Sequence, residues 1–394
     1  MRISELTHMS TVLVSNILRN LEKSGHIRKE GKTKTSGGRP SILYSIDPDI
    51  GVFLGISVRT DSFTISVLNT TGEIIKTLDY GLTLSSQPEE HVDNIVSRVS
   101  SETERLIQQL KSKYKPLALG ISVPGMVDTE NGIWQHGLQL TGITGVNLRD
   151  ILQNRLNIPG YIEDQSRAST LYEMRRGEGR DVQNWVLLYL GNGIGTGIVI
   201  RGELYRGHRG ISGEIGHLVV NKEGIRCSCG NIGCFETILS VPGILRHFRQ
   251  RLDEGVMSSL QKYHQNDSDN LSLEKIRNAA TERDKLTLST LFDIGLFLGD
   301  ACIKLIKILS PEKTIISGPA SILGDYFKNP MDITFTRQVM PEMLAGKTVM
   351  FAEYEYHHTA WGAAFGAMDS FWENVRIEDL SAAGRNRLLR KPGS

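Results

Sequence analysis

Three of the four cysteines in this 394-residue chain lie within eight residues of one another, at Cys227, Cys229 and Cys234, and His217 precedes the first of them by ten residues. Three thiolates and one imidazole form a donor set that suits zinc, and four such ligands close a tetrahedron without an open position for water. A disulfide framework would instead need an even and dispersed set of cysteines. We therefore expect these four side chains to form a structural zinc site.

The residues around this cluster form a motif. The run Gly213-Glu214-Ile215-Gly216-His217 and the segment Cys227-Ser228-Cys229-Gly230-Asn231-Ile232-Gly233-Cys234-Phe235-Glu236 resemble the signature of the ROK family, which contains bacterial sugar kinases and sugar-responsive repressors. The glycine-rich run 191–197, which follows the apolar run 185–190, resembles the family's second phosphate-binding strand and turn. The resemblance covers about residues 52–367, with a further match at the N-terminus. It implies an α/β protein with a two-lobed actin-like, ribonuclease-H-like body.

The hydrophobic pattern after Pro48 agrees with this fold, because strands and helices alternate. It predicts two strands on either side of Thr60-Asp61, a helix over residues 91–111, a buried strand over 117–123 and a helix of small residues over 359–371. We expect residues 50–163 with 351–375 to form a small lobe, and residues 164–350 to form a large lobe that carries the zinc site.

Two segments decide whether the body still transfers phosphate. Family kinases open their first lobe with an Asp-x-Gly-Gly-Thr-Lys turn near the ATP phosphates, but here that position reads Ser57-Val58-Arg59-Thr60-Asp61-Ser62. The nucleotide-binding turn that should read Gly-Gly appears as Ser317-Gly318-Pro319-Ala320. The loss of the glycines and of the lysine predicts weak nucleotide binding.

The position of the general base is also altered. The family's Glu-Asn-Asp-Ala segment, whose aspartate takes the proton of the sugar hydroxyl, is replaced by Glu163-Asp164-Gln165-Ser166. Gln165 stands at the base position, and an amide cannot accept that proton. Asp164 is a rival candidate, but a shift of one residue re-aims the side chain. We therefore expect a body without kinase activity; an active sugar kinase with Asp164 as base is the alternative.

The contacts to a sugar are better preserved than those to phosphate. By the resemblance, Glu214, His217 and Glu236 line one wall of the sugar pocket. Carboxylates and amides can bind neighbouring hydroxyl groups in a bidentate manner. One ring nitrogen of the histidine would bind zinc while the other faces the sugar. The full expected set of sugar-binding residues is Gln139, Asp164, Gln165, Glu214, His217 and Glu236.

The first 46 residues have a different character from the rest of the chain. They contain eight lysines and arginines against three acids, whereas the net charge of the whole chain is +1. Ser10 is a good N-cap for a helix in which Leu13, Ile17 and Leu21 recur on one face, and a shorter helix precedes it. Residues 26–29 and 41–46 predict the two strands of a wing around a basic tip over 31–36.

This pattern predicts a winged helix-turn-helix domain over residues 1–46. We expect Ser15, Asn16 and Arg19 to reach base edges and phosphates, and Arg39, in the run Gly37-Gly38-Arg39-Pro40, to enter a minor groove. Such a domain normally has another helix ahead, so the first helix is missing from the pattern. A solvated basic helix is the alternative interpretation.

These observations favour a sugar-responsive transcriptional regulator, most simply a repressor. Its expected partners are operator DNA, a sugar or sugar phosphate, and a second copy or three further copies of the chain. A regulator that a sugar-transport protein controls is a further alternative. The chain opens without a secretory segment and no apolar run approaches the roughly 18 residues of a membrane span, so we expect a cytoplasmic protein without membrane insertion.

Overall fold

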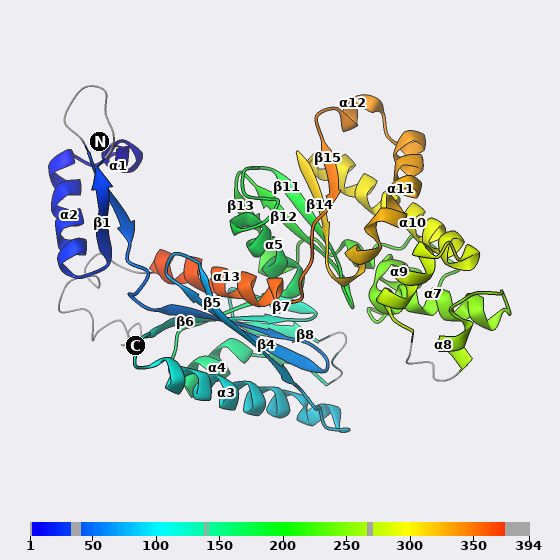
Figure 1. The fold of residues 1–394 in the computed structure, drawn as a ribbon, viewed down its shortest axis with the longest axis horizontal. Coiled ribbons are helices and arrows are strands. Elements are labelled where there is room, and N and C mark those ends of the chain that lie inside the picture. Colours follow the sequence, from blue (N-terminus) through cyan, green and yellow to red (C-terminus); the bar gives the residue numbers. More distant parts are fainter. Residues whose placement is uncertain (1, 33–40, 138–139, 141, 266–270, 375–394) are drawn as a thin grey trace.

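Two five-stranded sheets with the same internal order organise the body of the protein (Figure 1). The computed structural model describes residues 2–32, 41–137, 140, 142–265 and 271–374. In each sheet three consecutive strands form an antiparallel meander, and two later strands join in parallel beside the first of them. This repeated order is the arrangement expected for two ribonuclease-H-like lobes.

The first sheet has the order β10-β6-β3-β4-β5. The pattern-based strands on either side of Thr60-Asp61 and over 117–123 are confirmed. The strands are β3 (Val52–Val58), β4 (Ser62–Asn69), β5 (Ile74–Gly81), β6 (Pro116–Val123) and β10 (Gly160–Asp164).

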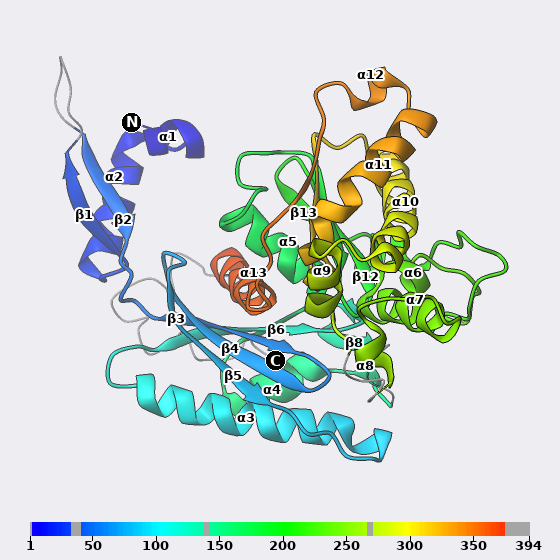
Figure 2. The same ribbon diagram turned by 45° about the vertical axis from the view of Figure 1, so that its right-hand side comes forward.

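Helices cover both faces of this sheet (Figure 2). On one face lie α3 (His91–Leu110), which follows the short turn η1 (Pro88–Glu90), and α4 (Leu148–Leu156). The predicted helix over 91–111 is confirmed as α3, and its apolar face is buried, because Ile95, Val99 and Leu106 are at most 1% exposed. A small sheet of β7 (Met126–Asp128), β8 (Ile133–His136) and β9 (Thr144–Val146) adjoins this face.

The opposite face carries α13 (His358–Asn374), the expected helix of small residues. It lies so close to the sheet that a Cβ on Gly55 would sit 2.0 Å from the carbonyl oxygen of Ala360, and one on Gly120 would sit 1.8 Å from that of Ala363. Only glycine allows this approach. Beside α13 lies α5 (Gln165–Arg175), so the two helices occupy the space between the two sheets (Figures 1 and 2).

The second sheet has the order β13-β12-β11-β14-β15. Its strands are β11 (Trp185–Leu190), β12 (Ile194–Ile200), β13 (Glu203–Tyr205), β14 (Lys313–Ser317) and β15 (Thr348–Phe351). Short turns and helices connect them or cover the face away from α5; these are η2 (His208–Gly210), η3 (Ile215–His217), α6 (Glu236–Leu239), α7 (Val241–Asp253), α8 (Gln261–Gln265), α9 (Leu273–Thr281), α10 (Lys285–Leu309), η5 (Pro319–Leu323), α11 (Gly324–Gln338) and α12 (Pro341–Leu344).

The longest of these helices, α10, contradicts the statement from the sequence that no apolar run approaches the length of a membrane span. Its 25 residues and its hydropathy of 1.5 over 18 residues meet the criteria for a helix that could cross a membrane, and it is the one such helix in the described part of the chain. The statement that no apolar run approaches this length was therefore wrong. In the fold, 61% of that window is buried, and α10 packs against α11 in the core of the second sheet.

The N-terminal unit consists of two helices and an antiparallel hairpin, as predicted. Ser10 accepts a hydrogen bond from the backbone N–H of Leu13 at 3.2 Å and so caps the second helix. The prediction that Leu13 lies on the apolar face was wrong, because it is 49% exposed and Val14, at 8%, takes the buried position. The elements are α1 (Arg2–Thr7), α2 (Thr11–Lys23), β1 (Ile27–Lys32) and β2 (Ile42–Ile46).

Candidate functional site

Five of the six predicted sugar-binding residues line one pocket between the two sheets. Asp164 ends β10 and Gln165 begins α5, whereas Glu214, His217 and Glu236 come from the segments around η3 and α6. The sixth, Gln139, lies outside the described residues. The pocket has a volume of about 60 Å³.

Both carboxylate oxygens of Asp164 make contacts within the local structure. One oxygen, Oδ1, accepts hydrogen bonds from the backbone N–H groups of Ser166 at 2.9 Å and Arg167 at 3.0 Å, so the carboxylate caps α5. The same oxygen accepts from the Ser166 hydroxyl, and Oδ2 forms an ion pair with the Arg167 guanidinium. A carboxylate held in this way is poorly placed to take a proton from a substrate.

Arg167 lies at the centre of a buried charge network. Its Nε donates to Glu163 at 2.9 Å, and both side chains are at most 2% exposed. On the other side, Arg206 donates to Glu163 at 3.0 Å and to the Tyr161 hydroxyl at 2.8 Å. Burial favours the neutral form of Glu163, but the two arginines outweigh it and lower its pKa. Because Arg206 follows β13, the network ties the second sheet to the first.

The predicted position of the general base is held against the first sheet. The Gln165 amide nitrogen donates to the carbonyl oxygen of Val58 at 3.1 Å. Near that carbonyl, β3 turns into β4 through a closed hairpin, in which the Arg59 N–H donates to the Ser62 carbonyl at 2.8 Å. The Arg59 side chain donates to the hydroxyls of Ser62 and Thr64, each at 3.0 Å. Arg59 is the one cationic residue of this turn, and its side chain therefore binds hydroxyl groups of β4.

Glu214 and Glu236 connect the pocket to the cysteine cluster. Glu214 Oε2 lies 3.8 Å from Nε2 of His217. Glu236 accepts from the backbone N–H of Ile194 at 3.2 Å and from the Ser228 hydroxyl at 3.2 Å. Burial, and then the nearby Asp164 carboxylate, raise the pKa of Glu214 to about 7. The carboxylates in the pocket therefore lie close enough to influence each other.

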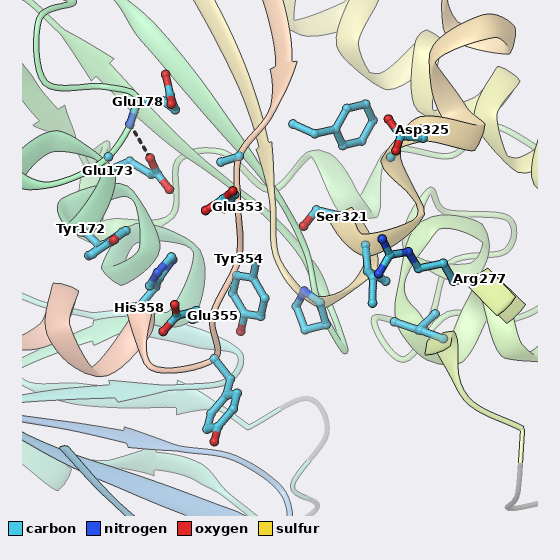
Figure 3. A pocket seen from close by; sticks show the side chains of 18 of the residues that line it. Tyr172, Glu173, Glu178, Arg277, Ser321, Asp325, Glu353, Tyr354, Glu355 and His358 are labelled. Atoms are coloured by element: carbon cyan, nitrogen blue, oxygen red, sulfur yellow. Dashed lines mark hydrogen bonds between the residues drawn. The ribbon is translucent and has the colours of Figure 1, made fainter. Parts of the chain in front are cut away.

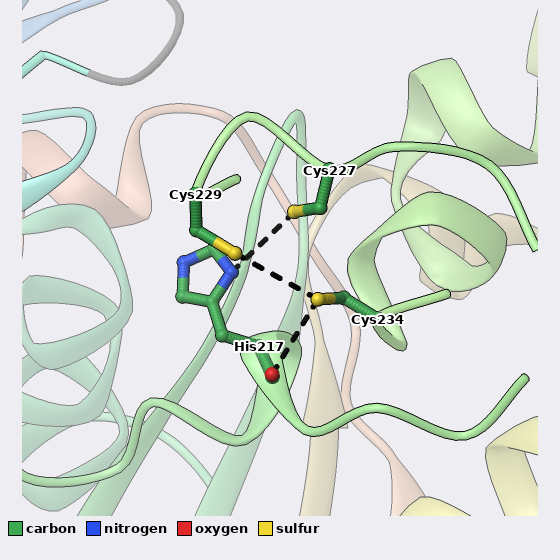
Figure 4. A group of neighbouring side chains, drawn as sticks. All are labelled: His217, Cys227, Cys229 and Cys234. Atoms are coloured by element: carbon green, nitrogen blue, oxygen red, sulfur yellow. Dashed lines mark hydrogen bonds between the residues drawn. The ribbon is translucent and has the colours of Figure 1, made fainter. Parts of the chain in front are cut away.

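The predicted metal ligands converge (Figure 4). One ligand atom from each of His217, Cys227, Cys229 and Cys234 lies within 4.8 Å of every other. Nδ1 of His217 lies 3.6 Å from the Cys227 sulfur, and the sulfurs of Cys229 and Cys234 are 3.7 Å apart. The cluster could hold a metal ion. Because Nδ1 faces the sulfurs, Nε2 is the ring nitrogen left for the pocket.

The predicted DNA-contacting residues share one exposed surface. Ser15, Asn16 and Arg19 are all exposed on α2. The Ser15 hydroxyl donates to the carbonyl of Thr11 at 2.8 Å, one turn earlier in the same helix. Arg39 lies outside the described residues. The structure thus places the three helix residues together and leaves the predicted wing contact as an expectation.

The charge network around Arg167 and part of the pocket wall were not predicted from the sequence. The spacing of Arg167, four residues after Glu163 on the start of a helix, is a signal that could have indicated an ion pair. Nothing in the local sequence indicated the partnership of Arg206 with Glu163, because these residues are 43 positions apart. The missed wall residues of the pocket are Pro124, Gly125, Met126, Ser166, Tyr189, Gly193, Ile194 and Gly195.

The charge network generates a stability prediction. Arg167→Ala would leave Glu163 buried with one of its two cations and Asp164 without its ion pair, so the free energy of unfolding should fall by about 3–5 kcal/mol. Urea denaturation measures this change. Arg180→Ala, which removes an exposed side chain that belongs to none of the ion pairs among the described residues, should stay within about 0.5 kcal/mol of the wild type. Equal losses in the two variants would contradict a structural role for the network.

Comparison with known proteins now places the chain. A family model described as "ROK family" matches residues 53–369. The chain is 29% identical over 334 residues to the xylose repressor of Caldicellulosiruptor bescii. The matched region covers 83% of this chain and 80% of that protein. It is 30% identical over 295 residues to a glucokinase of Halalkalibacterium halodurans, with 75% of this chain and 88% of that protein covered.

Among solved structures, a ROK family transcriptional regulator described as a homolog of the Escherichia coli MLC protein matches with a TM-score of 0.79. The identity is 24%, and the match covers 98% of this chain and 93% of the other. At that identity the likeness shows the fold, and it includes the N-terminal unit. With its family match over most of the length, this chain belongs to the ROK family.

Proposed function

We propose that this protein is a sugar-responsive transcriptional regulator whose ROK body binds a sugar effector and whose N-terminal unit binds operator DNA. The observation that carries the proposal is the convergence of Asp164, Gln165, Glu214, His217 and Glu236 on one pocket, in a chain that begins with a basic helix and hairpin. Hydroxyl groups of a sugar would bind to the carboxylates and the amide. The resemblance to a xylose repressor supports the same conclusion.

The pocket also suggests how a sugar would act. A sugar bound in this small pocket would contact walls from both sheets, so its affinity would depend on how far apart the walls lie. Those walls belong to both sheets, and Arg206 links them through Glu163. A sugar that prefers the wider arrangement would shift the population toward it, and the N-terminal unit would move with the first sheet.

We assign zinc to the cysteine cluster. Zinc binds thiolate sulfur at about 2.3 Å and imidazole nitrogen at about 2.0–2.1 Å, so tetrahedral ligand atoms lie roughly 3.4–3.8 Å apart. The two separations of 3.6 and 3.7 Å fit this geometry. With four protein ligands the ion supplies structure and no chemistry. It would fix the orientation of His217 beside Glu214 and thereby shape the sugar pocket.

We further propose that the body has no kinase activity. Gln165 occupies the base position and donates to a backbone carbonyl, and Asp164 caps a helix and pairs with Arg167. The turn before Ser62 lacks the glycines that would let a backbone approach phosphate. An active kinase that uses Asp164 is the alternative, which the resemblance to a glucokinase keeps open.

The architecture of the proposal has three parts. Residues 1–46 bind DNA, 50–163 with 351–375 form the small lobe, and 164–350 form the large lobe with the zinc site. Operator recognition would use Ser15, Asn16 and Arg19 of α2 with Arg39 of the wing, in a homodimer or homotetramer. Two other basic side chains of the N-terminal unit already form ion pairs within it: Lys29 pairs with Glu22 at 2.7 Å, and Arg28 pairs with Glu30 at 3.3 Å.

The zinc assignment predicts one zinc ion per chain in protein purified without chelator, as measured by elemental analysis. Cys229→Ser should lower the zinc content, the melting temperature and the affinity for sugar, because the ion orders the loop that carries the pocket. Cys302→Ala is the matched control: this cysteine lies in α10, outside the cluster, so its loss should leave the zinc content unchanged. Wild-type protein without zinc would refute the assignment.

The proposed loss of catalysis predicts no sugar-dependent ATP hydrolysis in a coupled assay with a panel of hexoses and pentoses. Gln165→Asp alone should not restore it, since the first phosphate turn is also altered and both sites must be competent for in-line transfer. A ROK glucokinase assayed in parallel provides the positive control. Turnover of about 1–100 s⁻¹ by the wild type would establish the kinase alternative instead.

The regulatory proposal predicts salt-sensitive binding to the promoter of the protein's own operon and release by the effector sugar, both measured by fluorescence anisotropy. Asn16→Ala and Arg19→Ala should each relax sequence preference by about 1–3 kcal/mol, and Arg39→Ala should weaken binding mainly at A·T-rich flanks. Arg105→Ala, an exposed arginine of the body, should bind like the wild type.

A separate variant tests the coupling between the proposed sugar pocket and the proposed DNA-binding surface. Glu214→Gln should bind promoter DNA normally yet respond less to sugar, because it changes a pocket carboxylate far from α2. The shift in promoter affinity caused by sugar must equal the shift in sugar affinity caused by DNA. If the protein does not distinguish promoter DNA from random duplex at moderate salt, the regulatory proposal fails.

A further inference from the structure

The loop that carries the cysteine cluster exposes a group of apolar side chains (Figure 4). Single exposed apolar residues are normal in soluble proteins, but a contiguous group rimmed by polar residues is typical of an interaction site. The lining of the candidate sugar pocket and the metal cluster include none of these side chains. Four large aliphatic residues of the loop are between 43 and 49% exposed: Leu218, Val219, Ile225 and Ile232.

Backbone hydrogen bonds place these side chains on neighbouring segments. Gly233 lies in the middle: its N–H donates to the carbonyl of Ile225 at 2.9 Å, and its carbonyl accepts from the N–H of Val220 at 2.8 Å. The stretches around Val220 and Ile225 therefore run on either side of the stretch that holds Ile232. We call the three segments together the platform; they are residues 218–221, 225–227 and 231–235.

The platform is tightly packed and ordered. Gly233 has a φ of +74°, and a Cβ at this position would lie 1.5 Å from the carbonyl oxygen of Asn221, so only glycine fits. At its outer end, the N–H of Cys227 donates to the carbonyl of Asn231 at 2.8 Å and closes a turn. A surface that is ordered in advance loses little conformational entropy when a partner binds.

Charged side chains of both signs lie on or beside the platform. Lys222, Glu223 and Arg226 are exposed and belong to none of the ion pairs among the described residues. Two cations and an acid this close in the chain are self-complementary. In an interface between two copies related by a twofold axis, Glu223 of one copy can meet Lys222 or Arg226 of the other. This pattern favours a second copy of the chain over a partner of a single charge sign.

The platform also adjoins the candidate sugar pocket. It begins directly after His217, which lines the pocket, and the Ser228 hydroxyl beside it donates to the pocket residue Glu236 at 3.2 Å. A second copy bound to the platform would therefore lie close to the pocket. Dimer formation and sugar binding can then influence each other through this loop.

We propose that two copies of this chain form a symmetric dimer through the platform. Its four exposed aliphatic side chains would pack at the centre, and Glu223 of one copy would pair with Lys222 and Arg226 of the other at the rim. The inference rests on the proposed function in one respect, because a regulator that recognises two operator half-sites needs two copies. It names the surface through which the copies associate.

Sedimentation velocity of the whole protein over a wide range of concentrations tests the proposal. The wild type should form a dimer, and Val219→Asp and Ile232→Asp should each raise its Kd roughly ten- to hundredfold, because each places a charge at the apolar centre. Both side chains are exposed in the single chain, so the variants should fold, which circular dichroism checks. Met257→Asp changes a residue that is 92% exposed and lies outside the platform, so it should dimerise like the wild type.

Charge reversal tests the twofold symmetry of the interface. Glu223→Lys makes all three rim charges positive, and the double variant Lys222→Glu/Arg226→Glu makes all three negative. Each protein alone should dimerise roughly tenfold more weakly than the wild type, because like charges then face each other. An equimolar mixture of the two should restore a dimer with one copy of each, and sodium chloride should weaken that mixed dimer.

Three outcomes would overturn the proposal. One is a wild type that stays monomeric at every concentration. Another is a dimer as stable in Val219→Asp and Ile232→Asp as in Met257→Asp, and the third is a mixture of the charge variants that associates no better than either protein alone. The last two results would leave the regulatory proposal intact, since the copies would then associate through another surface. Promoter binding tests that proposal separately.

Discussion

The buried ion pair between Arg167 and the two carboxylates at the end of β10 is the interaction on which the candidate site depends. Removing charges from water is costly unless they are paired, so Glu163 can remain ionised there only because Arg167 and Arg206 lie beside it. The same contacts fix the start of α5, orient the candidate pocket and attach the second sheet to the first. One cluster thus determines both the shape of the pocket and the connection between the lobes.

This arrangement also accounts for the contrast between the two cavities. The smaller one keeps carboxylates and an amide in positions suited to hydroxyl groups, supported by the cysteine cluster behind His217. The larger one, beside the end of α5 and the start of η5, is lined by six carboxylates and three cationic side chains (Figure 3). The proposed function, recognition of a sugar without phosphorylation, requires the first property and does not require nucleotide binding.

Few structural elements separate the pocket from the N-terminal unit. In the chain, Glu214 lies between Arg206 and His217, and its carboxylate lies 3.8 Å from Nε2 of His217. Arg206 in turn is bound to Glu163 at the edge of the first sheet. The first sheet continues directly into the N-terminal unit through the residues before β3. A change in the separation of the pocket walls would therefore reach α2 through covalently continuous and ion-paired elements.

Much of this protein could be predicted from its sequence, because the relevant signals are local. The candidate metal ligands lie close together in the chain, and the residue patterns predict strands and the helix over 359–371. The five motif residues described in the structure line one pocket. The α2 helix was predicted with its cap but with one wrong buried residue, Leu13. With only two helices and a hairpin in the unit, tertiary packing rather than periodicity decides which side of α2 is covered.

Only the tertiary structure decided the charge network, the engagement of Asp164 and the acidic cavity. Arg206 meets Glu163 across 43 residues, and the cavity brings together side chains from α5, α9, α11 and the segment before α13. Contacts of this kind depend on how two sheets and their helices pack, which no periodicity in a single segment encodes. The sequence therefore determined which chemical groups are present and which elements carry them, and the packing of the two lobes decided which groups meet.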